Sequence, residues 1–139
     1  MHTKGVKTKM TLREITNDAL SEILKKHLAW INDEPGGEQA DLSYADLRHA
    51  DLSYANLSYA NLRYADLSYA DLRSANLDYS AFPLWCGSFG VKVDIRLGAQ
   101  LAYHFCRLDT ENEDVKKAQK ALKILANKFH RVKECGEIE

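Results

Sequence analysis

The hydrophobic positions in the middle of the chain recur every five residues. From Ala40 to Tyr79 eight units follow one another without a gap: Ala opens each unit, Asp or Asn takes the second place, and Leu takes the third. A helix would scatter these leucines around its axis, since five residues turn the chain through about 500°. A flat strand would send successive leucines to opposite faces. The period therefore predicts a chain that turns a corner in the fourth and fifth places and winds into a solenoid with Ala and Leu inside.

A helical pattern precedes the repeat and is expected to span Leu12 to Asn32. Thr11 and Glu14 have the spacing of a capping box, and the segment 33–37 contains the turn residues that end a helix. The end of a solenoid exposes apolar interior, so we interpret this helix as a lid on the first coil, with Trp30 as a packing residue. The alternative is a recognition or dimerisation helix. Its apolar stripe consists of Leu12, Ile15, Ala19, Leu20, Ile23, Leu24, Leu28 and Ile31.

The residues after the repeat are expected to cap the second end of the solenoid. Phe82 stands in the place of a Leu and would begin a third coil, and the segment 84–93 is expected to be irregular or briefly extended. Helices are expected from Asp94 to Leu108 and over 112–130. They would form a hairpin covering the open end above Phe82, or pair with a second copy to make a homodimer. The inward residues would be Leu97, Leu101, Ala102, Phe105, Leu108, Val115, Ala118, Leu122, Leu125 and Phe129.

Tandem units of A-(D/N)-L-x-x resemble those of the pentapeptide-repeat family, and eight units in register make a specific signature. The resemblance implies a mainly β solenoid, a right-handed quadrilateral β-helix with four units per coil and hence about two coils. Small bacterial and prophage members are similar in having a helix before the repeat and a helical tail after it. The prolines and glycines that flank the repeat divide the chain into a basic arm 1–11, a capping helix and turn 12–39, the solenoid 40–83 and a helical cap or dimerisation region 84–139. The implied core is Leu42, Leu47, Leu52, Leu57, Leu62, Leu67, Leu72, Leu77 and Phe82.

Charge and composition narrow the function classes. The 139 residues contain 19 Lys and Arg against 20 Asp and Glu, a net charge of -1, which disfavours direct binding of nucleic acid by the molecule as a whole. No apolar run approaches the roughly 20 residues that cross a bilayer. Lys4, Lys7 and Lys9 are not followed by the apolar stretch of a secretory signal, so a cytoplasmic location is expected. The three cysteines are expected to be free thiols, since an odd number cannot pair fully within one chain.

The outer wall of the solenoid supplies the candidate binding surface. Aromatic side chains one coil apart would form ladders that stabilise the stack and offer rigid contact area to a protein partner. The leading hypothesis is accordingly a non-catalytic protein-interaction module that needs no cofactor. Its candidate binding residues are Tyr44, Tyr54, Tyr59, Tyr64, Tyr69, Tyr79, Asp46, Asp51, Asp66 and Asp71.

Two alternatives stay open. Some pentapeptide-repeat relatives act as DNA mimics that occupy the DNA site of a type II topoisomerase. Residues 40–79 contain six Asp and three Arg, which gives the solenoid a net charge of -3. Duplex DNA carries about six negative charges over a rod of about 10 Å. The solenoid is therefore less acidic than the DNA it would mimic, and this alternative stays second. The other alternative is a metal- or thiol-dependent activity of the C-terminal segment. Its weak ligand candidates are Cys86, Cys106, His130 and Cys135. They lack the paired spacing of zinc sites, so neither a metal site nor an enzyme is predicted.

Overall fold

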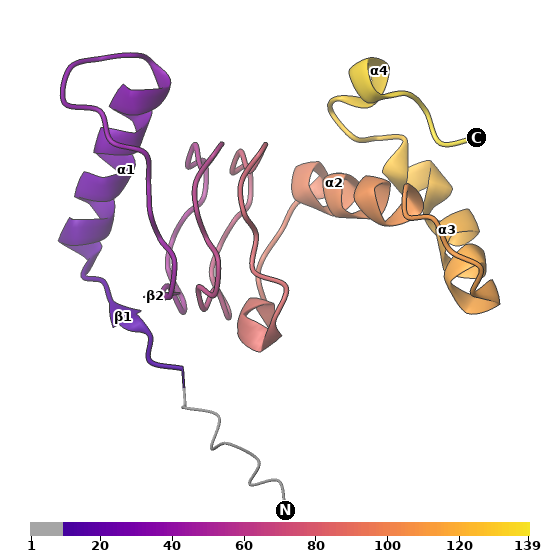
Figure 1. Ribbon diagram of the computed structural model, residues 1–139, viewed down its shortest axis with the longest axis horizontal. Helices are drawn as coiled ribbons and strands as arrows, with labels where there is room; N and C mark the ends of the chain where they lie inside the picture. The colour runs from indigo at the N-terminus through magenta and orange to yellow at the C-terminus, as the bar shows by residue number, and fades with distance from the viewer. Residues whose placement is uncertain (1–9) are drawn as a thin grey trace, which may run out of the picture.

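The computed structural model describes residues 10–139 and shows three parts in a row (Figure 1). Helix α1, Asn17–Ile31, stands at one end, the wound repeat lies in the middle, and α2, Ile95–Cys106, leads to the other end. The remaining elements are short or follow α2: β1 Arg13–Glu14, β2 Ala45–Asp46, the 3-10 turn η1 Cys86–Ser88, α3 Glu113–Ala126 and α4 Val132–Cys135. The predicted basic arm with Lys4, Lys7 and Lys9 lies outside the described residues.

The repeat winds with a period of 20 residues, which is four units per coil. Parallel bridges join second-place residues one coil apart, at Asp41 and Asn61, Asp46 and Asp66, Asp51 and Asp71, and Asn56 and Asn76. The four units per coil that the family resemblance implies are thus observed. Each bridge is one residue wide because a corner follows it, so the coils are held by isolated bridges instead of long strands. The expected mainly β content is therefore too high: in residues 10–139 the named strands are β1 and β2, and helices hold more of the chain.

Each corner is a turn that the unit builds from its own residues. The leucine carbonyl accepts the N–H of the residue that opens the next unit, at 2.8–3.1 Å in all eight units. The Oδ1 atom of the second-place Asp or Asn accepts the N–H two residues later, at 3.0–3.2 Å in all eight. The fifth place has a positive φ of 57–62° in every unit. Asp or Asn is required in the second place because a short side chain with an acceptor closes this turn.

The core of the coils is a closed column of leucines with alanines between them. Leu42, Leu47, Leu52, Leu57, Leu62, Leu67 and Leu72 are essentially inaccessible to solvent, and Leu77 is buried as well. Phe82 packs partly buried against the same cluster, as expected for the start of a third coil. Full burial of a leucine contributes about 1.5–3 kcal/mol, so this column dominates the stability of the fold.

The N-terminal helix begins later than predicted. Arg13 and Glu14 form β1, which pairs in parallel with β2 on the first coil, and α1 begins only after Thr16, whose hydroxyl accepts the Ala19 N–H. The capping box at Thr11 is thus wrong. The unpaired backbone edge of the first coil captures residues 13–14 as a strand, and this tertiary pairing overrides the local helical pattern. Leu20 of α1 is buried in the core, so the helix covers the first coil as expected.

The C-terminal segment departs further from the prediction. Residues 81–92 continue the coil, since Ala81 bridges Asn61 and Lys92 bridges Asp71. Helix α2 starts after its cap Asp94, as predicted, and α3 ends at Ala126 instead of His130. The two helices pack on each other and lead away from the coils, so they leave the end above Phe82 only partly covered (Figure 1). Leu101 and Leu108, expected to point inward, are exposed.

Candidate functional site

The outer wall carries stacked aromatic side chains, as expected for the four-sided coil that the resemblance implies. Tyr44 stacks on Tyr64 with ring centroids 4.8 Å apart, and Tyr59 stacks on Tyr79 at 4.9 Å. Interplanar angles of 16° and 13° show near-parallel rings. Tyr54 has Ser74 in the next coil, lacks a stacking partner within residues 10–139, and is 82% exposed. We call the six exposed tyrosines the tyrosine wall: Tyr44, Tyr54, Tyr59, Tyr64, Tyr69 and Tyr79.

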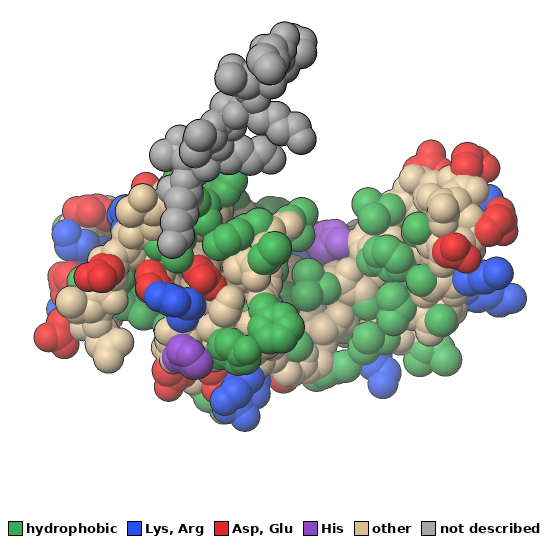
Figure 2. Space-filling view, turned by 90° about the horizontal axis from the view of Figure 1, so that it is seen from below, with side chains coloured by type: hydrophobic (Ala, Val, Ile, Leu, Met, Phe, Trp, Pro, Cys, Tyr) green, Lys and Arg blue, Asp and Glu red, His purple; other side chains and the backbone are tan. Residues whose placement is uncertain are grey.

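A third aromatic column continues beyond the repeat. His49 stacks on Tyr69 at 5.2 Å, and the exposed ring of Phe89 meets Tyr69 edge-on at 5.6 Å. Gly90 has a φ of +68°, and a Cβ atom there would collide with the Tyr69 ring, so only glycine lets the chain pass this close. Figure 2 shows one face of the molecule on which hydrophobic side chains gather in the middle and charged ones lie mostly toward the ends.

The candidate carboxylates of the wall are largely committed to the coil itself. Arg48 donates to Asp46 through Nε and Nη2, at 2.9 and 2.7 Å. Arg73 binds Asp71 in the same bidentate way, at 2.9 and 2.6 Å. Hydrogen bonding to these guanidinium groups holds the pKa of Asp46 below its usual value and lowers that of Asp71 to about 2. Two of the four candidate carboxylates therefore present a neutral ion pair to solvent.

The other two candidate carboxylates are bound in their turns. Asp51 accepts both the N–H and the hydroxyl of Ser53, and these bonds lower the pKa of Asp51. Asp66 accepts the Ser68 N–H and lies 3.9 Å from the Arg48 guanidinium. The same turn forms around Asn56, which has no charge. The second-place carboxylates thus serve the turn first, and their charge is not needed for it.

Comparison with known proteins agrees with this geometry. The family model described as Pentapeptide repeats matches residues 40–78 in eight copies. This segment belongs to the pentapeptide-repeat family. No curated protein and no solved structure matches the chain. None of the helices in the described part combines the length and apolar character needed to cross a bilayer.

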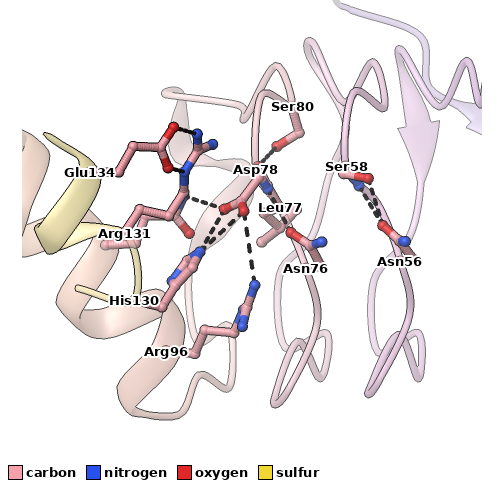
Figure 3. A network of polar contacts seen from close by, with 11 residues as sticks. Asn56, Ser58, Asn76, Leu77, Asp78, Ser80, Arg96, His130, Arg131 and Glu134 are labelled. Carbon is pink, nitrogen blue, oxygen red and sulfur yellow. Dashed lines mark hydrogen bonds and ion pairs between the residues drawn. The ribbon is translucent and has the colours of Figure 1, made fainter. Parts of the chain in front are cut away.

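A polar junction ties the last pentapeptide repeat to the C-terminal segment (Figure 3). Asp78 accepts hydrogen bonds from His130 Nε2 at 2.9 Å and from Gln100 Nε2 at 3.0 Å, and Arg96 lies 3.9 Å away. Arg131 pairs with Glu134, and its guanidinium lies 4.7 Å from the centroid of the Tyr79 ring. His130 and Asp78 are 52 residues apart in the chain. The junction therefore holds the C-terminal segment against the fourth side of the pentapeptide coils.

A cavity lies beside this junction. It has a volume of about 380 Å³, is mainly apolar and is open to solvent on one side. Its walls come from the last repeat, from α2 and from the segment after α3, and include Leu77, Tyr79, Phe82, Leu97, Leu101, His104, Phe129 and Cys135. It exists because the helical hairpin leads away from the coil end instead of lying flat on it.

The cysteine and histidine candidates are spread over the C-terminal segment that follows the repeat. Cys86 lies in η1, Cys106 bonds to the Gln119 carbonyl, His130 binds Asp78, and Cys135 lines the cavity. All three cysteines are free, as predicted. Burial raises the pKa of the Cys106 thiol. Within residues 10–139 no three His, Cys, Asp or Glu side chains come together as metal ligands would.

Two structural residues escaped the sequence analysis. His27 sits in the helical stripe of α1 and is fully buried, with both ring nitrogens bonded. No spacing rule marks it, because its partners are backbone groups from distant units. Asp78 could have been found: the fourth place holds Ser or Arg in the other seven units, and Asp78 alone is acidic there. That departure from the pattern marks the side on which the chain contacts another segment.

Proposed function

We propose that this chain is a non-catalytic protein-interaction module built on a right-handed quadrilateral β-helix, with the tyrosine wall as its binding surface. The proposal is supported chiefly by the stacked, half-exposed rings of Tyr44, Tyr64, Tyr59 and Tyr79. Stacking orders these side chains before any partner arrives, so binding costs little further rotamer entropy. Tyrosine also combines a broad apolar contact area with a hydroxyl for hydrogen bonding.

The arrangement of charge supports a partner protein with a surface of mixed polarity over a polyelectrolyte. The ion pairs of Arg48 with Asp46 and of Arg73 with Asp71 leave little net field between the aromatic columns. A protein surface of mixed polarity complements such a wall better than a polyelectrolyte does. We place the boundary between the coils and the C-terminal cap at Asp94, because residues 81–92 still pair with the coil below.

Tyr54 is the best probe of this proposal, because it is exposed and unstacked, and its replacement leaves the aromatic columns intact. A photoreactive phenylalanine at position 54 is expected to crosslink to a protein partner, which mass spectrometry then identifies. The same residue at position 124, on the exposed face of α3, is the matched control. With the purified partner, Tyr54→Ser is expected to weaken binding by about tenfold, as for an exposed aromatic side chain that a partner covers. Crosslinking from position 124 alone, or unchanged affinity of Tyr54→Ser, would contradict the tyrosine wall.

The DNA-mimic alternative depends on carboxylates that remain free to resemble phosphates. Two of the four candidates carry bidentate arginines, so this alternative has less support than the tyrosine wall. It would take the lead if the partner proved to be a DNA-binding enzyme whose affinity falls when the four candidates become Asn. Those four are Asp46, Asp51, Asp66 and Asp71. Asn keeps the turn, as Asn56 and Asn61 show, so this variant tests charge and not folding.

A further inference from the structure

The three arginines of the repeat stand in the fourth place of their units, but only two of them have a carboxylate in the same unit. Arg48 and Arg73 pair with the Asp of their own unit at 2.7 and 2.6 Å. Arg63 follows Asn61, whose Oδ1 atom closes the turn by accepting the Arg63 N–H at 3.1 Å. An amide carries no charge, and in the described chain no ion pair includes Arg63. Its guanidinium therefore keeps an uncompensated charge on the wall.

The sides of the coil differ in charge for this reason. Units two and six, which stack on each other, contain two Asp and one Arg, and so do units three and seven. Units one and five, which we call the first side, contain Arg63 and a single carboxylate, Asp41. Strand β1 adds a second guanidinium there, because Arg13 donates to the Ser43 and Asp41 carbonyls, both at 2.9 Å. On the first side arginines thus outnumber carboxylates.

A stacked pair of tyrosines adjoins the Arg63 guanidinium. The next residue, Tyr64, stacks on Tyr44 with ring centroids 4.8 Å apart, and the two residues are 45% and 41% exposed. The Arg63 guanidinium carbon lies 6.0 Å from the centroid of the Tyr64 ring, at the outer limit of a cation–π contact. Tyrosine and arginine are among the residues enriched at the energetic centres of protein interfaces. The first side therefore presents a cation next to apolar area on ordered rings.

The chemistry of the first side favours an acidic segment of a protein. A carboxylate can accept two parallel hydrogen bonds from the Arg63 guanidinium, as the carboxylates of Asp46 and Asp71 do from their own arginines. An exposed ion pair alone contributes little, but a partner that covers it with apolar contact to the rings strengthens it. A nucleic acid fits less well, because it needs several phosphate contacts and this side offers two guanidinium groups beside a carboxylate.

We propose that Arg63 and the stack of Tyr44 on Tyr64 form a binding site for an acidic segment of a partner protein. A carboxylate of the segment pairs with the Arg63 guanidinium, and a neighbouring aromatic side chain of the segment lies against the two rings. This site rests on the proposed function, because both tyrosines belong to the tyrosine wall, and it adds the charge that the partner must present. Tyr54 belongs to unit three, on another side of the coil.

The test uses the full chain and a probe peptide, acetyl-Asp-Phe-Asp-amide, with acetyl-Asn-Phe-Asn-amide as its uncharged match. Binding is followed by NMR at the Nε–H groups of the three repeat arginines and at the Tyr64 amide. At millimolar concentration the acidic peptide is expected to shift the signals of Arg63 and Tyr64. The signals of Arg48 and Arg73 are expected to move much less, because both already have carboxylate partners. The uncharged peptide is expected to bind about tenfold more weakly.

One substitution compensates the charge of Arg63 without removing the side chain. Asn61→Asp gives unit five the same Asp and Arg as units two and seven, so Arg63 is expected to pair within its unit. The acidic peptide is then expected to bind about tenfold more weakly. Asn56→Asp changes the net charge equally on the fourth side and is the matched control, which should leave the affinity unaltered. Both variants keep the turn, because Asp closes it in other units.

Several results would overturn this proposal. They are no shift at Arg63 with the acidic peptide, equal effects of the two peptides, shifts as large at Arg48 and Arg73, and equal affinities of Asn61→Asp and Asn56→Asp. A short oligothymidylate that shifts the Arg63 signals more than the acidic peptide does would overturn the assignment to a protein. The Tyr54 crosslink uses a ring on another side, so failure of this site and failure of the proposed function remain distinguishable.

Discussion

The Nε2 atom of His27 lies 2.8 Å from the carbonyl oxygen of Ser58, and this bond joins α1 to the first coil. The other ring nitrogen, Nδ1, accepts the N–H of Ala40 at 2.9 Å. Because Ala40 can only donate, the ring must be neutral, with its proton on Nε2. Burial lowers the pKa of His27 below its ordinary value of 6.5. The helix that covers the coils is thus attached through a group that has to stay uncharged.

Attachment of α1 should therefore weaken in mild acid. Since the pKa of His27 is lower in the folded chain than in the unfolded one, its contribution to stability is complete above about pH 6.5 and is lost as the pH falls through the folded value. Thermal unfolding between pH 7.5 and 5 is expected to show a falling midpoint. Hydrogen exchange in the helix 17–31 is expected to accelerate before exchange at the buried leucines does. A midpoint independent of pH over this range would contradict attachment of α1 through a neutral His27.

Substitution of His27 separates its hydrogen bonds from its charge. His27→Leu leaves the Ala40 N–H and the Ser58 carbonyl without partners, which is expected to cost about 2–4 kcal/mol of unfolding free energy. His27→Gln offers one donor and one acceptor that do not titrate, so the variant is expected to retain more stability and to lose the pH dependence between 7.5 and 5. Urea unfolding at both pH values measures this. His49, exposed on the wall, supplies the matched control in His49→Gln.

Two tyrosines in the fifth place of the unit are expected to lower the unfolding free energy by different amounts when each is replaced by Ala, because only one of them is stacked. Tyr64 stacks on Tyr44, and Tyr64→Ala is expected to lower the unfolding free energy by about 1 kcal/mol. Tyr54→Ala removes an unstacked, 82% exposed ring and is expected to change it by only a few tenths of a kcal/mol. Both positions have a φ near 60°, so strain is common to the pair. If chemical denaturation gave equal losses of unfolding free energy for the two variants, the aromatic stacks would contribute nothing to stability.

The turn carboxylate of Asp71 predicts part of the acid sensitivity of the coils. The pKa of Asp71 is lowered to about 2, chiefly by hydrogen bonds from Arg73. Its contribution is therefore present above the usual Asp value of 3.8 and is lost as the pH falls toward 2. Asp71→Asn keeps the turn and is expected to flatten stability between pH 4 and 2, as followed by circular dichroism. Asp109→Asn, at an exposed residue outside the repeat, is the control that should keep the wild-type acid profile.

The junction at Asp78 predicts local release of the C-terminal segment. Asp78→Ser restores the residue common in the fourth place but removes the acceptor for His130 and Gln100. Limited proteolysis is expected to cut the segment 127–139 faster, by roughly the factor of ten that corresponds to about 1.4 kcal/mol. The unfolding midpoint of the coils is expected to move little. Glu111→Gln, an exposed change before α3, should leave the cleavage rate unaltered.

Local rules explain why the middle of the fold could be predicted. Each unit closes its own corner, because the second-place Oδ1 and the leucine carbonyl bond within the same few residues. Eight repetitions of one corner leave the chain little choice of path. The columns of Leu42 and Leu62 and the stack of Tyr44 on Tyr64 follow from that path. The candidate carboxylates were found for the same reason, but their pairing with Arg48 and Arg73 was overlooked.

The ends of the fold could not be predicted in this way. The pairing of Arg13 and Glu14 with the first coil, and the contact of His130 with Asp78, join residues about 30 to 52 positions apart. Helical periodicity correctly indicated α2 and α3 but carried no information on where the hairpin points. The cavity depends on that direction, so it was not foreseen. These features result from competition among distant segments for exposed edge and apolar surface.

The sequence by itself determined the period, the inward leucines, the corner in the fourth and fifth places and the outward tyrosines, because all of them rest on geometry repeated within five residues. Only the tertiary structure decided how each end of the coils is closed. At the first coil a strand and the neutral His27 complete the edge. At the last coil α2 takes over from the coil: Leu97 joins the buried leucine core, while the Leu77 and Tyr79 backbone N–H groups have no hydrogen-bond partner in the described chain.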